Sequence, residues 1–132
     1  MNRQPLEIEV RSKLGFEATV AALVEAVPQH KMTVLAVHPL SQTLASKGFP
    51  REPISVIEVC NARMASQALE DDVRVALMMP CPVAVFERAG EVHVSTMDTR
   101  LLSQMYEGER MPTLGQEMFA ELSALLQIVA DR

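Results

Sequence analysis

Two neighbouring segments that alternate apolar and polar residues constrain the fold more than any other feature of the chain. The first runs from Val83 to Glu87 and the second from Glu91 to Ser95, with Arg88-Ala89-Gly90 between them. Alternation with a period of two is typical of half-buried strands, and a short connection that contains glycine is typical of a hairpin. The sequence therefore predicts an antiparallel hairpin, and with it a sheet that is mainly antiparallel.

Three segments upstream of the hairpin also have strand character. Residues 6–10 and 53–60 alternate in the same way, and residues 32–37 are rich in β-branched side chains. Such side chains pack well on a pleated, half-buried surface. We expect these segments to join the hairpin in one sheet.

Helical spacing appears between the first strands. Apolar residues recur on one face over residues 16–27, which predicts an amphipathic helix there. A second helix of only a turn or two is expected after Pro39, because proline suits the first turn of a helix. Leu40 and Leu44 are its expected inner residues.

The remaining helices are marked by capping residues. Asn61 is a good N-cap for a helix after the third strand, and Asp98 can cap another after the hairpin. Thr113 and Gln116 have the spacing of a capping box before a long final helix. The loop over residues 107–112 is the one candidate hinge.

The length of the chain and the order of these elements indicate one domain. A chain of 132 residues is of the usual size for a single domain, and no repeat or linker interrupts it. Strands that are hairpin neighbours, with helices at both ends, are typical of the α+β class. We therefore expect a single α+β domain over residues 1–132, with helices packed on one face of a mainly antiparallel sheet.

The charge and hydropathy of the chain narrow its partners and its location. A net charge of −5 argues against nucleic acid, because binding phosphates takes clustered Lys and Arg. No apolar run approaches the ~20 residues that a membrane span needs. The first residues also lack the apolar stretch of a secretory signal. A cytoplasmic protein with no membrane or nucleic-acid partner is the expectation.

The two cysteines offer the best candidate for a functional site. Cys60 ends one predicted strand and Cys81 begins the next, so the two can meet on neighbouring rungs of an antiparallel sheet. Cys60 precedes a helix N-terminus, and Arg63 lies in the first turn of that helix, both of which favour a thiolate. One hypothesis is therefore a redox or sulfur-handling role with Cys60 reactive and Cys81 as its resolving partner. The alternative is that both are small buried hydrophobic residues.

A metal site is a weaker variant of the same hypothesis. His38 and His93 would complete a set of two thiolates and two imidazoles, which are ligand types that suit Zn²⁺ or Cu(I). The spacing is not that of a zinc finger, and both histidines fit a hydrogen-bonded or solvent-facing role. No metal or cofactor is assigned from the sequence.

Two non-catalytic functions stay open beside thiol chemistry. A sheet roofed by helices can enclose an apolar cavity for a small-molecule ligand, and the nine methionines would give it adaptable walls. The methionines named for this role are Met64, Met78, Met79, Met97, Met105 and Met118. The other function is a dimeric scaffold. The chain has no phosphate-binding glycine loop and none of the common hydrolase motifs, so no catalytic residue is assigned.

Motifs around the cysteines resemble those of a known family. Val59-Cys60-Asn61 and Met79-Pro80-Cys81, at this separation and followed by the hairpin, identify the chain as similar to the domain-of-unknown-function 302 family. The resemblance covers nearly the whole chain and implies a curved antiparallel sheet of the TATA-box-binding-protein-like class and a homodimer. It places any functional site around Cys60, Asn61 and Cys81. Fold alone does not carry function, and this family has no agreed activity.

Overall fold

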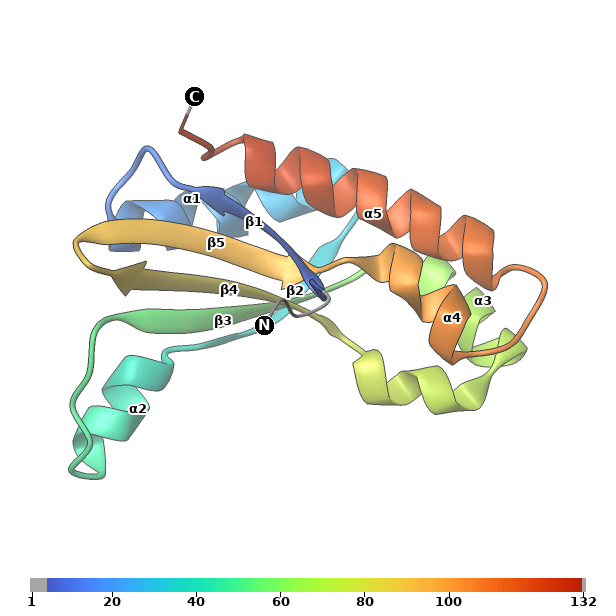
Figure 1. Ribbon diagram of the computed structural model, residues 1–132, viewed down its shortest axis with the longest axis horizontal. Coiled ribbons are helices and arrows are strands. Elements are labelled where there is room, and N and C mark those ends of the chain that lie inside the picture. Colours follow the sequence, from blue (N-terminus) through green and yellow to red (C-terminus); the bar gives the residue numbers. More distant parts are fainter. Residues whose placement is uncertain (1–4, 132) are drawn as a thin grey trace.

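Five antiparallel strands form one open sheet in the computed structural model, which describes residues 5–131 (Figure 1). The strands lie in the order β1-β5-β4-β3-β2, so β1 and β2 are the two edges. Their bounds are β1 (Glu7–Arg11), β2 (Thr33–His38), β3 (Ile54–Cys60), β4 (Cys81–Arg88) and β5 (Glu91–Met97). The predicted hairpin is confirmed as β4-β5, with Ala89 and Gly90 at φ 53° and 80° in the turn. Positive φ at both central residues matches the twist of a two-residue hairpin.

Helices on one side of the sheet complete the core. The helical segments are α1 (Phe16–Ala26), η1 (Val27–His30), α2 (Leu40–Ser46), α3 (Ala62–Asp71), η2 (Val73–Met78), η3 (Thr99–Leu101), α4 (Leu102–Met105) and α5 (Met111–Gln127). Alternate residues of the central strands, such as Ile57, Val59 and Val83, are fully buried with Leu23 of α1 and Leu122 of α5. The single α+β domain is thereby confirmed. No helix of residues 5–131 has the length and hydropathy to cross a membrane.

Helix α2 does not pack as its sequence suggests. It projects from the body of the domain (Figure 1), and none of its residues is buried. Leu40, predicted to face inward, is 37% exposed. Ser41 links the helix to β3, by accepting a hydrogen bond from the backbone N–H of Ile54 and donating one to its carbonyl oxygen. The prediction of an inward apolar face is therefore wrong for Leu40.

The N-terminus of α5 is also built differently from the prediction. The helix begins at Met111, with Arg110 as its N-cap residue, so the capping box of Thr113 and Gln116 is wrong. Instead, Asp71 at the end of α3 accepts hydrogen bonds from the backbone N–H and the guanidinium of Arg110. A carboxylate from another helix thus does the work expected of a local cap.

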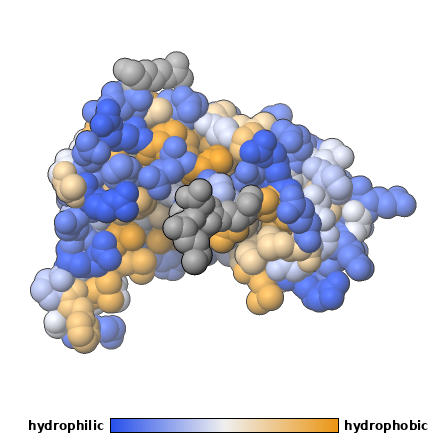
Figure 2. All heavy atoms as spheres, in the orientation of Figure 1, coloured by the Kyte–Doolittle hydropathy of each residue, from blue (hydrophilic) through white to orange (hydrophobic). Residues whose placement is uncertain are grey.

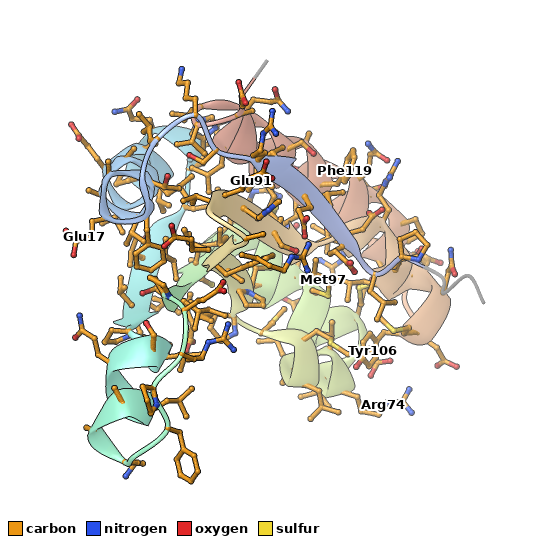
Figure 3. The ribbon with its side chains drawn as sticks, turned by 60° about the vertical axis from the view of Figure 1, so that its left-hand side comes forward. Glu17, Arg74, Glu91, Met97, Tyr106 and Phe119 are labelled. Atoms are coloured by element: carbon orange, nitrogen blue, oxygen red, sulfur yellow. The ribbon has the colours of Figure 1, made fainter. Side chains whose placement is uncertain are left out.

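Asp72 holds the loop over residues 107–112 at its first residue. Its carboxylate accepts hydrogen bonds from Arg74 and, at 3.0 Å, from the backbone N–H of Glu107. The hydrogen bond from the Arg74 side chain, with that from Glu107, holds the pKa of Asp72 well below its ordinary value. Arg74 and Tyr106, which precedes Glu107, lie on the same side of the molecule in Figure 3. The predicted hinge over residues 107–112 is therefore held at both Glu107 and Arg110.

Candidate functional site

The two cysteines lie at neighbouring strand ends, as the sequence predicts. Val59 of β3 is the register partner of Cys81 of β4, and Cys60 is the next residue of β3. Both cysteines are free thiols of intermediate exposure. Register partners point to the same face of the sheet, so the side chain of Cys81 lies on the helix-covered face with Val59. Successive residues of a strand point to opposite faces, so the side chain of Cys60 points to the other face. The thiols are diagonal neighbours and do not face one another across the ladder.

Asn61 links the end of β3 to two other segments. Its side-chain oxygen accepts a hydrogen bond from the backbone N–H of Met64, which caps α3 as predicted. Its side-chain Nδ2 donates to the carbonyl oxygen of Lys31, where the backbone is left-handed at φ 62°. Both polar ends of this 9% exposed side chain are therefore engaged. The described contacts give Asn61 a structural role beside the cysteines.

Arg63 and His38 contact other side chains and not the cysteine thiols. The guanidinium of Arg63 donates to Glu117 of α5 at 2.8 Å and to Gln67 at 3.1 Å. His38 contacts the carboxylate of Glu58 near the outer end of β2, and its side chain is 46% exposed. The structure thus engages both predicted residues in surface pairs, away from the pocket that the cysteines line.

The histidines do not join the cysteines in a metal site. His93 stacks on Phe86 and lies within ion-pair distance of Glu9 and Glu91. Among residues 5–131, no three His, Cys, Asp or Glu side chains gather closely enough to hold a metal ion. The mixed thiolate and imidazole set considered from the sequence is therefore not assembled.

A small pocket opens where β3 and β4 end, and both cysteines line it. Its volume is about 50 Å³. The walls come from the end of β3 and the start of β4, from α3, η2 and η3, from the first turn of α4 and from the first two turns of α5. The lining residues are Val59, Cys60, Asn61, Met64, Ala65, Ala68, Val75, Met78, Met79, Pro80, Cys81, Thr99, Leu102, Met111, Leu114, Gly115 and Met118. We call this site the cysteine pocket.

The surroundings of the cysteine pocket keep the Cys81 thiol protonated. Burial among apolar side chains raises the pKa of Cys81 to about 11, and the nearby Cys60 adds to the shift. A thiol attacks as its thiolate, so a raised pKa makes Cys81 a poor nucleophile near neutral pH. The pocket wall is apolar and the Cys81 thiol is neutral. Such surroundings suit the binding of a ligand better than the transfer of a group to the thiol.

Sequence reasoning found part of this pocket. Met64, Met78, Met79 and Met118 were expected as cavity walls and do line it, whereas Met97 and Met105 do not. Met111 also lines the pocket: the sequence predicts a loop there, but Met111 is the first residue of α5. The methionine content was the available signal, but which methionines converge depends on how α5 crosses the sheet.

The fold and the pocket define a small α+β protein in which an open antiparallel sheet, covered by helices, ends in an apolar pocket. The family model described as "Domain of unknown function DUF302" matches residues 8–129, and the chain belongs to this family. A solved structure, the uncharacterized conserved DUF302 protein from Bacillus stearothermophilus, is similar with a TM-score of 0.86 and 22% identity. The match covers 94% of this chain and 98% of that chain. At this identity the likeness shows the shared fold. No curated protein sequence matches the chain.

Proposed function

We propose that this protein is a non-catalytic binding protein whose ligand is a small apolar or sulfur-seeking group held in the cysteine pocket. The observation that carries the proposal is the pocket itself, with walls of methionine, cysteine and aliphatic side chains. A volume of roughly 10–15 Å³ on this measure admits one water molecule, so 50 Å³ admits a ligand of a few heavy atoms. Flexible methionine walls can adapt to a somewhat larger one.

Thiol redox chemistry has less support from the same geometry. A disulfide needs two Cβ vectors that point toward each other, and adjacent pleat positions direct those of Cys60 and Cys81 apart. The raised pKa of Cys81 also weakens it as an attacking group.

Binding can be tested with a probe that reports its own position. We expect xenon, a small apolar probe that enters cavities of this kind, to shift the NMR signals of ¹³C-labelled methionine methyl groups. The five methionines that line the pocket should shift, whereas Met97 and Met105 outside it should not. Shifts spread over all methionines, or none at any xenon pressure, would contradict the proposal.

A matched pair of variants on α3 tests the same site. Ala65→Leu places a larger side chain in the pocket wall and should abolish the xenon shifts by filling the space. Ala62→Leu, on the same helix but exposed and outside the lining, should leave them unchanged. Equal loss in both variants would place the xenon elsewhere.

We propose further that the chain forms a homodimer through β2 and α2. Leu35 and Phe49 are 56% and 69% exposed, and Val37 and Leu40 are 39% and 37% exposed. Figure 2 shows hydrophobic residues over the projecting α2 region at the lower left. A helix of seven residues with no buried side chain is marginal in water alone, so a partner that covers it is expected.

The opposite sheet edge is protected, which singles out β2 as the joining edge. On β1, the Arg11 guanidinium pairs with Asp131 at 2.7 Å and with Glu91 at 3.2 Å, and Asp131 donates its backbone N–H to the Arg11 carbonyl. Strand β2 contains no Lys, Arg, Asp or Glu, and charged side chains are what commonly protect an edge strand from pairing. A bulge between Val34 and Ala36 breaks the ladder there, so side-chain packing of two equal apolar surfaces is the expected contact.

The dimer predicts a large effect of one surface charge. Phe49→Glu should raise the dissociation constant of the dimer by at least ~100-fold, because a twofold contact brings the new charge against its copy. Leu77→Glu is the control, since Leu77 is 84% exposed but lies on η2. Analytical ultracentrifugation measures both. A monomeric wild-type chain, or dissociation by Leu77→Glu alone, would overturn this assembly.

A further inference from the structure

Sulfur is concentrated in the cysteine pocket beyond what a general apolar cavity needs. Both cysteines and five of the nine methionines of the chain line it. The five methionines are Met64, Met78, Met79, Met111 and Met118. They come from α3, η2 with its following residue, and α5, so elements far apart in sequence contribute methionines to one pocket.

The same pocket offers almost no other donor. None of its lining residues is a histidine, an aspartate or a glutamate. The side chain of Asn61 is engaged with Met64 and Lys31, and the Thr99 hydroxyl donates to the Gly115 carbonyl at 2.7 Å. What is left for a ligand is soft sulfur.

We infer that the cysteine pocket binds a soft monovalent metal ion of the Cu(I) class, held by the Cys81 sulfur and lining methionine thioethers. The inference rests on the proposed binding function and names its ligand. Thiolate and thioether sulfur select Cu(I), whereas carboxylate and water oxygens suit Mg²⁺, Ca²⁺ and Mn²⁺. Cys60 also lines the pocket, from the end of the neighbouring strand.

Charge also favours a monovalent ion in this pocket. One thiolate and one monovalent cation have a net charge of zero, so the apolar pocket buries no net charge. A divalent ion bound to a single thiolate would leave a net charge of +1 buried in the pocket. On binding, the Cys81 S–H bond breaks, its proton passes to solvent, and a sulfur–copper bond forms. No electron is transferred, because the copper arrives already reduced.

Anaerobic titration of the reduced chain with Cu(I), against the chromophoric chelator bicinchoninate, tests the inference. We expect one ion per chain and methyl shifts confined to the pocket methionines, with Ag(I) giving the same pattern as a redox-inert ion. Zn²⁺ should give no such shifts. Binding of Zn²⁺ with equal affinity, or Cu(I) bound without any methionine shift, would overturn the inference.

Variants separate the ligands from the core. Cys81→Ala should weaken Cu(I) binding by more than the ~10- to 100-fold that loss of an outer-sphere group costs. Leucine replaces methionine at similar volume, so Met64→Leu with Met118→Leu should fold and bind Cu(I) at least ~10-fold more weakly. Met32→Leu is the control, because Met32 is 4% exposed in the core but outside the pocket. Equal binding in all three would contradict the site.

The xenon experiment distinguishes the two levels of proposal. If xenon shifts the pocket methionines and Cu(I) does not, the protein binds small apolar ligands and the metal inference is wrong. If neither does, the binding function itself fails.

Discussion

Gly115→Ala is expected to destabilise the fold by about 1–3 kcal/mol, the usual cost of overpacking a filled interior. Gly115 lies in α5 where the helix passes over η3, and a methyl group at its Cα would come 2.5 Å from the Thr99 carbonyl oxygen. The backbone carbon of Thr99 would be 3.3 Å away. The neighbour is backbone and cannot rotate aside, so α5 or η3 has to move.

The sign of this effect is informative because helix propensity alone predicts the reverse. Alanine is more favourable than glycine inside a helix by about 1 kcal/mol, so an unhindered site would be stabilised. Urea unfolding measures the difference. Gly15→Ala is a control for the close contact alone, since nothing lies within 4 Å of a Cβ there and its φ is −68°. Gly15 is the N-cap of α1, so no gain from helix propensity is expected at that position. A Gly115→Ala chain as stable as wild type would show that α5 does not approach Thr99 this closely.

The same contact connects stability to the pocket. Thr99 and Gly115 both line the cysteine pocket, and the Thr99 hydroxyl donates to the Gly115 carbonyl. Displacing α5 at Gly115 would also move Met111 and Met118, which lie about one turn to either side of it. We therefore expect Gly115→Ala to weaken xenon binding along with folding.

Local patterns predicted the strands and most helices, because their signals are carried by the segments themselves. The hairpin and the alternation of β3 need only a period of two, and Asn61 caps α3 with its own side chain. The start of α5 was misplaced because its stabilising group, Asp71, belongs to another helix. The outward position of α2 was missed because a repeat of leucines does not say whether the body of the domain reaches them.

Only the part of the site that depends on strand order could be predicted from the sequence. Neighbouring ends of β3 and β4 followed from the antiparallel order, which is why Cys60 and Cys81 were placed together. The role proposed for Arg63 stays a prediction, and its guanidinium donates to Glu117, which is far away in sequence. The pocket walls depend in the same way on where α5 crosses the sheet, which is a tertiary fact that one-dimensional periodicity does not contain.

Asn61→Ala is the second substitution for which we expect a large loss of stability, about 2–4 kcal/mol. Loss of an asparagine N-cap costs about 1 kcal/mol. The Lys31 carbonyl also loses its donor in a part-buried hydrogen bond, and leaving such a group unsatisfied costs up to about 1–3 kcal/mol. The two losses add because Asn61 is 9% exposed and solvent replaces neither hydrogen bond fully.

Asn61→Asp separates these two contributions and also tests whether Asn61 touches the ligand. The carboxylate can still accept from the Met64 N–H, so the cap survives, but nothing then donates to Lys31 and a negative charge faces its carbonyl oxygen. We expect this variant to lose about 1–3 kcal/mol in urea unfolding, less than Asn61→Ala. Below its unfolding midpoint it should bind xenon like wild type, because both polar ends of Asn61 serve the fold. Loss of xenon binding in a fully folded Asn61→Asp chain would instead make Asn61 a ligand contact.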